Sequence, residues 1–490
     1  MKEMGEVFFS LLTLNNLLYM NIGLLGGIVV GALPGLTATM AVALLVPMTY
    51  GLDATTGILM LLGVYCGGTY GGSITAILIN TPGTPAAAAT AWDGHVLAKK
   101  GRAGEALEMA LVASVFGGLF STLVLMFVAP QIAKLALKFG PAEYFALAVF
   151  GLTIIASVSK SLVKGLIMGI LGILATCIGV DPVSGIERLT FGNLRLTSGI
   201  QLIPALIGLF AITEILNKAK NSQEAAGTLE AYKKVTLKLK TILQYWKILI
   251  KSSCIGTFIG AVPGTGAAIA SFISYNEAKR ASKEPELFGN GSLEGVCASE
   301  CGNNAVTGAT LIPLLTLGIP GDAITAVLIG ALTMQGLAPG PQLFVDHKEY
   351  VYGIMLGLIL VNIFMYFQGH FLLKFFVNIT KVPEVVMVPI LLVLCTVGAY
   401  AAKNAVFDAW VMVIFGIMGY FLKKLDFPLT PMVIGIVLGS MAEKNYRRAL
   451  MISNGSASIF LQKPIALFFL ILAAAMLLMP IIRNRKVKKV

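Results

Sequence analysis

The chain has 490 residues, of which 57% are hydrophobic and only 12% are charged. Soluble globular domains carry about 25% charged residues, so this composition excludes an ordinary water-soluble protein. A membrane-spanning helix needs about 20 apolar residues, and the apolar fraction suffices for about a dozen of them. The sequence therefore predicts an all-α polytopic membrane protein. The first residues are mixed in charge and lack a small-residue cleavage site, so we expect no cleavable signal peptide.

The net charge of +12 is concentrated in three clusters. Eight lysines lie between positions 217 and 251, five basic residues lie in 483–490, and Lys99, Lys100 and Arg102 form the third cluster. Basic residues in short loops mark the cytoplasmic side of a membrane protein. We interpret the clusters as determinants of topology in a lipid bilayer, and we expect no nucleic acid partner.

Apolar runs predict about 10 to 14 membrane segments, including broken half-helices and re-entrant hairpins. The longest uninterrupted runs lie at 106–130, 351–373, 385–402 and 464–482. Shorter or interrupted runs lie at 7–30, 36–50, 56–80, 144–158, 163–180, 199–216, 252–275, 304–338, 405–422 and 429–442.

Three motifs occur twice in the same order, which indicates two internal repeats. The segment 31–38 returns at 260–267, Thr81-Pro-Gly-Thr84 returns as Ile-Pro-Gly-Asp at 319–322, and the segment 204–208 returns at 431–435. Parallel and inverted repeats both remain open, and the placement of positive charge favours inversion. The predicted parts are a first transmembrane repeat, a basic cytoplasmic linker, a second transmembrane repeat, and a C-terminal helix with a basic tail, at 1–216, 217–247, 248–443 and 444–490.

Each half contains two Pro-Gly pairs within apolar sequence, at 34–35, 82–83, 263–264 and 320–321. Proline removes a backbone donor and glycine adopts conformations closed to other residues, so each pair is expected to break a helix. Within a membrane, such backbone is tolerated only where it is buried in protein or lines a wet cavity. Paired interruptions point to a transporter substrate site, where helix N-termini offer N–H donors to an anion. The alternative at each break is a proline kink without a ligand.

The candidate binding residues gather at these breaks. Those expected to bind the substrate are Gly35, Thr37, Asn80, Thr81, Pro82, Gly83, Thr84, Gly264, Thr265, Gly266, Pro320 and Gly321. Those expected to bind a cation, because hard cations prefer oxygen ligands, are Asn303, Asn304 and Asp322. Interhelical hydrogen bonding is the alternative role of the two asparagines.

The substrate site is expected to hold an anion without a basic side chain, because neither 80–84 nor 318–322 contains Lys or Arg. Backbone N–H groups would bind a carboxylate there, aided by the hydroxyls of Thr81 and Thr84. We expect the glycine after each proline to stay free of a side chain so that the ligand reaches the backbone. On this basis Gly118, in the uninterrupted 106–130 run, is expected to tolerate alanine.

Other kinds of site are not indicated. The glycine-rich segment 260–266 lacks the Lys-Ser/Thr pair of a phosphate-binding loop, and the three histidines have no second metal ligand at helical spacing. No cofactor is expected apart from a coupling cation, Na⁺ or H⁺, and amide-rich oxygens favour Na⁺. The six cysteines are expected to be packing residues.

Several of these motifs resemble the large membrane subunit of the tripartite tricarboxylate transporters over at least residues 20–440. The matching segments are 31–37, 71–83, 275–283, 285–289, 291–295, 303–305 and 317–321. Two departures stand out: Ser299-Glu-Cys-Gly302 replaces a Pro-Glu-Ala/Ser-Ala pattern, and Asp322 replaces a small hydroxyl residue. An acid beside an anion site is repulsive unless it binds the coupling cation, so Asp322 leaves the identity of the substrate open.

The resemblance implies a non-enzymatic function in the bacterial cytoplasmic (inner) membrane. A citrate-like di- or tricarboxylate would arrive on an extracytoplasmic solute-binding protein and would be imported together with a cation down its gradient. A small four-helix membrane subunit is the other implied partner. An anion channel or uniporter is the alternative function, and an intramembrane enzyme is a weaker one because no nucleophile–base pair is visible.

The charge clusters generate a topology prediction. Cysteines introduced as Thr228→Cys in the linker and Val487→Cys in the tail, in a cysteine-reduced background, should resist an impermeant thiol reagent in intact cells. Permeabilised cells, in which both cysteines should react, are the control. Labelling of either position from outside would overturn the cytoplasmic assignment.

Overall fold

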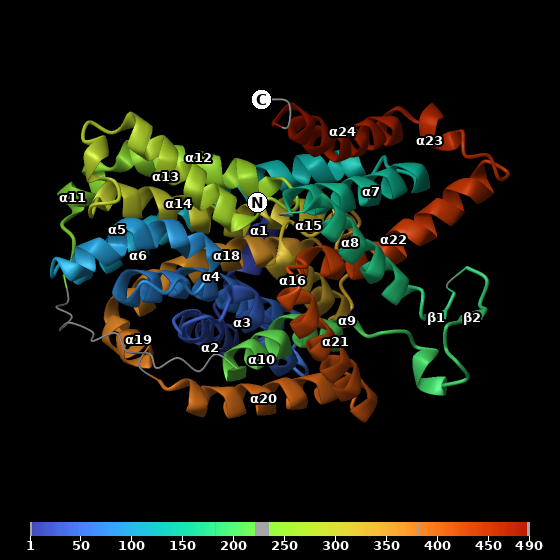
Figure 1. Ribbon diagram of the computed structural model, residues 1–490, viewed down its shortest axis with the longest axis horizontal. Helices are drawn as coiled ribbons and strands as arrows, with labels where there is room; N and C mark the ends of the chain where they lie inside the picture. The colour runs from blue at the N-terminus through green and yellow to red at the C-terminus, as the bar shows by residue number, and fades with distance from the viewer. Residues whose placement is uncertain (1, 160, 182, 221–234, 381, 488–490) are drawn as a thin grey trace.

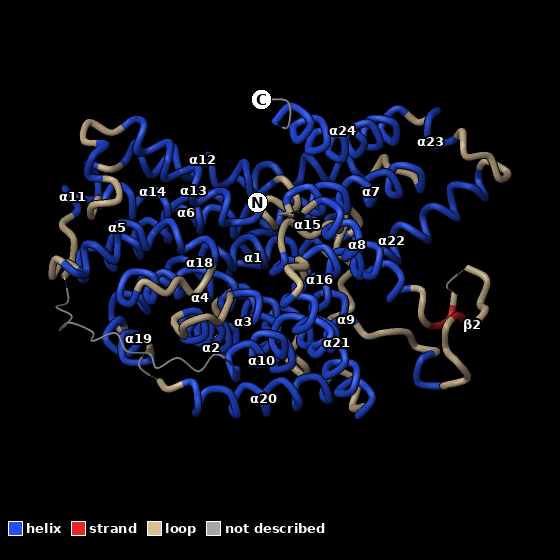
Figure 2. The backbone as a smooth tube through the Cα atoms, viewed as in Figure 1, coloured by secondary structure: helices blue, strands red, loops and turns tan. Residues whose placement is uncertain are grey.

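The computed structural model describes residues 2–159, 161–181, 183–220, 235–380 and 382–487 (Figure 1). This part of the chain is almost entirely helical, and the only strands drawn in Figure 2 form one short hairpin. Six helices are long and apolar enough to cross a membrane, and six shorter apolar helices accompany them. The predicted all-α polytopic membrane fold is therefore confirmed.

The elements before the linker follow the apolar runs of the sequence. They are α1 (Lys2–Leu11), α2 (Leu14–Gly31), α3 (Ala38–Leu45), η1 (Val46–Thr49), α4 (Ala54–Ile79), η2 (Pro85–Ala87), α5 (Ala88–Lys99), α6 (Ala103–Ala136), α7 (Pro141–Val158), α8 (Leu162–Thr176), β1 (Gly179–Val180), β2 (Glu187–Arg188), η3 (Leu194–Leu196), α9 (Leu202–Leu206), η4 (Ile207–Ile212) and α10 (Thr213–Lys220).

The elements after it show the same succession of long helices and breaks. They are α11 (Leu239–Gln244), α12 (Trp246–Ala261), α13 (Gly266–Ala281), η5 (Pro285–Leu287), α14 (Leu293–Ala309), α15 (Leu311–Leu317), α16 (Ala323–Met334), α17 (Leu343–Asp346), α18 (Lys348–Phe371), α19 (Leu373–Ile379), α20 (Glu384–Ala401), α21 (Val406–Lys424), α22 (Thr430–Ile452), α23 (Ile459–Gln462) and α24 (Pro464–Val487).

The four Pro-Gly breaks all lie between helices, as predicted. The bounds of two predicted apolar runs, 7–30 and 106–130, differ in the structure. The 7–30 run is two helices, because Thr13 interrupts it and caps α2 by accepting a hydrogen bond from the Asn16 backbone N–H (3.4 Å). Conversely, α6 continues past Pro130. Residues 221–234 of the predicted 217–247 linker lie outside the described residues.

The two halves pack against each other reciprocally. Helix α6 of the first half lies along α14 of the second, while α18 of the second lies along α4 of the first. Likewise α8 packs against α22, and α21 packs against η4 and α9. Figure 1 shows α7, α8, α22 and α24 on one side of the molecule and α20 with α21 along its lower edge. Whether the halves are inverted repeats stays a prediction.

Glycines let the helices around the breaks approach to backbone contact. A Cβ atom added to Gly27 or Gly31 of α2 would lie 2.5 Å from a carbonyl oxygen of α4. A Cβ atom added to Gly67 or Gly71 of α4 would likewise lie 2.5 Å from a carbonyl oxygen of α2. This is the small-residue spacing of close helix pairs in membranes. In the second half Gly256 and Gly260 of α12 place α12 against α14 in the same way.

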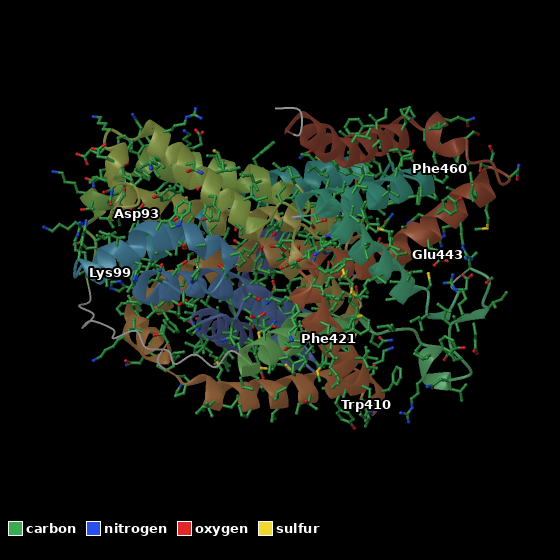
Figure 3. The ribbon with its side chains drawn as sticks, viewed as in Figure 1. Asp93, Lys99, Trp410, Phe421, Glu443 and Phe460 are labelled. Carbon is green, nitrogen blue, oxygen red and sulfur yellow. The ribbon has the colours of Figure 1, made fainter. Side chains whose placement is uncertain are left out.

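A charged cluster fixes the β1–β2 hairpin, which projects at one end of the molecule (Figure 2). Arg188 in β2 pairs with Glu443 of α22 (2.5 Å), which Figure 3 labels, and Arg447 pairs with Asp181 (2.5 Å). Hydrogen bonds from the Val183 backbone N–H and the Ser184 hydroxyl, with the Arg447 guanidinium, hold the pKa of Asp181 well below its ordinary value.

The glycine contacts generate a stability prediction. Gly256→Ala should lower the melting temperature of the purified protein in detergent, because its Cβ would overlap the Gly302 backbone. Overpacking of this kind costs about 1–3 kcal/mol. Gly353→Ala in α18 is the matched control, because its Cβ would first meet Leu11 at 3.9 Å. Equal melting temperatures for the two variants would contradict the tight α12–α14 contact.

Candidate functional site

A cavity of about 240 Å³ lies among the four predicted breaks. Both halves contribute to its wall. Its lining residues are Thr37, Ala38, Thr39, Thr69, Thr84, Pro85, Ala86, Gly264, Gly266, Ala267, Ala268, Asn303, Asp322, Ala323, Ile324 and Thr430. These lining residues include no Lys or Arg.

Several helices begin at this cavity. Thr37 caps α3, Thr84 caps η2 at the start of the η2–α5 unit, and Asp322 caps α16. Helix α13 begins at Gly266 and α22 begins at Thr430, so two more N-termini lie in the wall. Each N-terminus leaves backbone N–H groups without an intrahelical partner and carries partial positive charge. Their convergence makes the cavity suited to a multiply charged anion.

Six of the predicted site residues line the cavity: Thr37, Thr84, Gly264, Gly266, Asn303 and Asp322. The other nine do not line it: Gly35, Asn80, Thr81, Pro82, Gly83, Thr265, Pro320, Gly321 and Asn304.

The two threonines of the first repeat's second break face different ways. Asn80 has a left-handed backbone (φ 54°) and turns the chain at the end of α4. Thr81 is exposed, and its hydroxyl donates to the carbonyl of Ile79 (3.3 Å). Thr84 is buried in the cavity wall, where its hydroxyl accepts from the Ala87 N–H (3.3 Å). Only Thr84 is placed to meet a ligand.

Gly83 and Gly321, which follow the prolines of two breaks, lie in close packing contacts. A Cβ on Gly83 would lie 2.8 Å from the Cα of Gly72, and one on Gly321 would lie 2.7 Å from the Cβ of Thr310. A Cβ on Gly118 would meet the Asn362 side chain of α18, which would have to shift, so the expected tolerance of Gly118 to alanine stays a prediction. Sequence alone did not reveal that neighbour.

Backbone groups at the breaks take part in hydrogen bonds within the protein. The Gly264 N–H donates to the carbonyl of Gly321 (2.7 Å), which joins the two breaks of the second half. The Gly83 N–H donates to Gly72 (3.2 Å) in the first half. At the remaining break the Lys218 ammonium of α10 donates to the carbonyl of Pro34. Freed backbone groups are thus partnered inside the protein, as the membrane requires.

Asp322 has a structural role that limits its freedom as a ligand. Its carboxylate accepts from the Thr325 N–H and hydroxyl (2.8 Å each) in a capping box. The Tyr65 hydroxyl of α4 donates to the other carboxylate oxygen (3.3 Å). Asp322, whose charge would repel an anion in the cavity, is therefore held by hydrogen-bond donors in one part of the cavity wall.

A buried polar cluster beside the cavity was only partly anticipated. Asn304 donates to the Ser114 hydroxyl of α6 (2.8 Å), and that hydroxyl donates to the carboxylate of Glu300 (3.1 Å). The Thr90 hydroxyl of α5 donates to the other oxygen of Glu300. Of these four residues only Asn304 was a predicted site residue, although an ionisable residue in a membrane helix, here Glu300, is itself a signal of function.

The long apolar helices define a multi-pass membrane protein, and its broken backbone surrounds the cavity. Residues 17–434 match the model of the tripartite tricarboxylate transporter TctA family. The chain therefore belongs to this transporter family, and the resemblance seen in its motifs is confirmed.

Two curated relatives come from Agrobacterium vitis. The chain is 37% identical to an uncharacterized 52.8 kDa protein in the TAR-I ttuC' 3' region, over 98% of this chain and 97% of the relative. It is 34% identical to an uncharacterized protein in the TAR-II ttuC' 3' region, over 47% of this chain and 97% of that relative. No solved structure shows significant similarity to the chain.

The opposite orientations of Thr81 and Thr84 generate a prediction. Thr84→Val should lower carboxylate uptake by about tenfold or more, because a hydrogen bond to a charged group contributes about 1.5–3 kcal/mol. Thr81→Val should leave uptake within about twofold of wild type, since losing an exposed bond to Ile79 costs little. Uptake of radiolabelled citrate by cells of the native host would measure both.

Thr84→Ser controls for the helix cap that Thr84 also provides, because serine keeps both the cap and the hydroxyl. It should restore most of the uptake. Equal effects of Thr81→Val and Thr84→Val would remove Thr84 from the site.

Proposed function

We propose that the chain is the membrane subunit of a secondary importer that binds a di- or tricarboxylate in the cavity between the breaks. The convergence of helix N-termini on one cavity without basic side chains carries this proposal. A flexible anion with two or three carboxylates matches several dispersed N–H donors better than it matches one fixed charge. The family supports the tricarboxylate class.

The wider system is part of the same proposal. An extracytoplasmic solute-binding protein delivers the carboxylate, and a small four-helix membrane subunit completes the complex in the bacterial cytoplasmic (inner) membrane. A gradient of Na⁺ or H⁺ drives import. The family's description as tripartite supports these partners. The reciprocal packing of the two halves supports a site formed between repeats, where transporters of this architecture move one half against the other.

Counterflow tests the proposal. Right-side-out membrane vesicles from the native host are loaded with unlabelled citrate and diluted into labelled citrate. A carrier should accumulate label transiently, a channel should only equilibrate it, and an enzyme should alter it chemically. Other di- and tricarboxylates compete in parallel to define the class.

Ala323→Leu tests the location of the site, because Ala323 is the first residue of α16 and lines the cavity. Leucine there should cover the helix N-terminus and abolish counterflow while leaving the amount of protein in the membrane unchanged. Ala474→Leu on the exposed face of α24 is the control and should transport normally. Counterflow in Ala323→Leu at the wild-type rate would place the substrate site elsewhere.

A further inference from the structure

Glu300 is a fully buried carboxylate at the meeting point of several helices. It lies on α14 with no exposed surface and receives hydrogen bonds from Thr90 of α5 and Ser114 of α6. The Asn304 amide adds a longer contact to the same carboxylate (3.4 Å). In the described part of the chain no ion pair reaches it. An isolated carboxylate in such surroundings is very costly without a compensating positive charge.

Two other buried acids show how this fold accommodates a carboxylate when no ligand is needed. Asp93 of α5, labelled in Figure 3, accepts three backbone N–H groups at 2.8–2.9 Å and the hydroxyl of Tyr275 (2.8 Å). Glu108 of α6 pairs with His370 of α18 (3.0 Å). Glu300 has neither a backbone nest nor a basic partner.

The side chains around Glu300 carry polar atoms that lack hydrogen bonds. Ser73 of α4 and Asn303 lie close enough to interact with the Glu300 carboxyl group. The Ser73 hydroxyl, both polar atoms of Asn303 and Oδ1 of Asn304 are nevertheless buried without a hydrogen-bond partner. Each of these residues is at most 1% exposed. Buried polar groups are normally paired, so this concentration of buried oxygens with open lone pairs beside a carboxylate suits the coordination of a cation.

We propose that Glu300 and these neighbours form a binding site for one Na⁺ ion. The ligating atoms are the Glu300 carboxylate, the hydroxyl oxygens of Thr90, Ser114 and Ser73, and the amide oxygens of Asn303 or Asn304. The site rests on the proposed function, since it supplies the cation coupling that the importer requires. It keeps Asn303 and Asn304 of the cation site expected from the sequence and has Glu300 in place of Asp322, which caps α16.

The donor set selects the kind of cation. All ligands are hard oxygens, which suit Na⁺, Ca²⁺ and Mg²⁺. A single carboxylate balances one positive charge, whereas dedicated divalent sites use more acidic ligands. A proton would neutralise Glu300 but would leave the amide oxygens of Asn303 and Asn304 unpaired. A monovalent metal ion would neutralise the charge of Glu300 and would also be bound by the amide oxygens.

The helices packed around Glu300 offer little other charge. Cys297 and Cys301 on α14 are buried thiols. Asp93 on α5 and Glu108 on α6 have the partners described above, and Lys251 on α12 pairs with Glu277 at the surface. The nearest route for an ion is the cavity itself, because Asn303 lines the cavity and also lies beside Glu300.

Binding of ²²Na⁺ to the purified full-length chain, with choline as the replacement cation, tests the site directly. Wild type should bind Na⁺ saturably, and NaCl should raise its melting temperature more than choline chloride does. Glu300→Gln should abolish both effects. Ser114→Ala, which keeps the carboxylate and removes one ligand, should raise the half-saturating Na⁺ concentration by about tenfold. Glu108→Gln is the control and should bind Na⁺ as wild type does.

The outcomes separate this site from the proposed function, because Na⁺ binding requires no carboxylate. Unchanged Na⁺ binding by both Glu300→Gln and Ser114→Ala would overturn the site, as would wild type that binds no Na⁺ and takes up citrate only down a pH gradient. Wild type that binds Na⁺ through Glu300 but shows no citrate counterflow would reject the proposed substrate and leave the ion site intact.

Discussion

The structure depends on one constraint: backbone groups freed at a helix break inside a membrane must find partners within the protein. Glycines meet this constraint by letting backbone approach backbone. Gly83 fits against Gly72, and Gly264 donates to Gly321 across two breaks. The glycine spacing along α2 and α4 holds the helices that carry the first pair of breaks. The cavity is what remains between these tightly anchored turns, so its shape is set by backbone rather than by long flexible side chains.

The sequence predicted where the chain breaks because proline and glycine act locally. It did not predict which residue of each break faces inward, because that depends on the rotation of the following turn. The left-handed conformation of Asn80 directs Thr81 outward, and the chain returns to the cavity only at Thr84. Likewise a Cβ on Gly118 would meet the side chain of Asn362, which lies 244 positions further along the chain. No local pattern in the sequence reveals this contact.

The proposed ion site illustrates the same limit. Glu300, Asn303 and Asn304 share one face of α14 at helical spacing, and this much is visible in the sequence. Thr90 and Ser114 lie in helices that look unremarkable on their own, and only the packing of α5 and α6 on α14 brings their hydroxyls to the carboxylate. Local patterns therefore locate the element that carries the charge, while tertiary packing decides which side chains accompany it.

Asn303 joins the two proposed sites, and this position gives coupling a physical basis. With its amide oxygen on Na⁺, its N–H₂ group is left to donate toward a carboxylate in the cavity. Without the ion, the negative charge of Glu300 would disfavour an anion nearby. Each ligand then strengthens binding of the other by the same factor, as linkage requires. Because Asp322 is held by Thr325 and Tyr65, the proposed ion would neutralise the charge of Glu300, and the affinity of the cavity for an anion would rise with it.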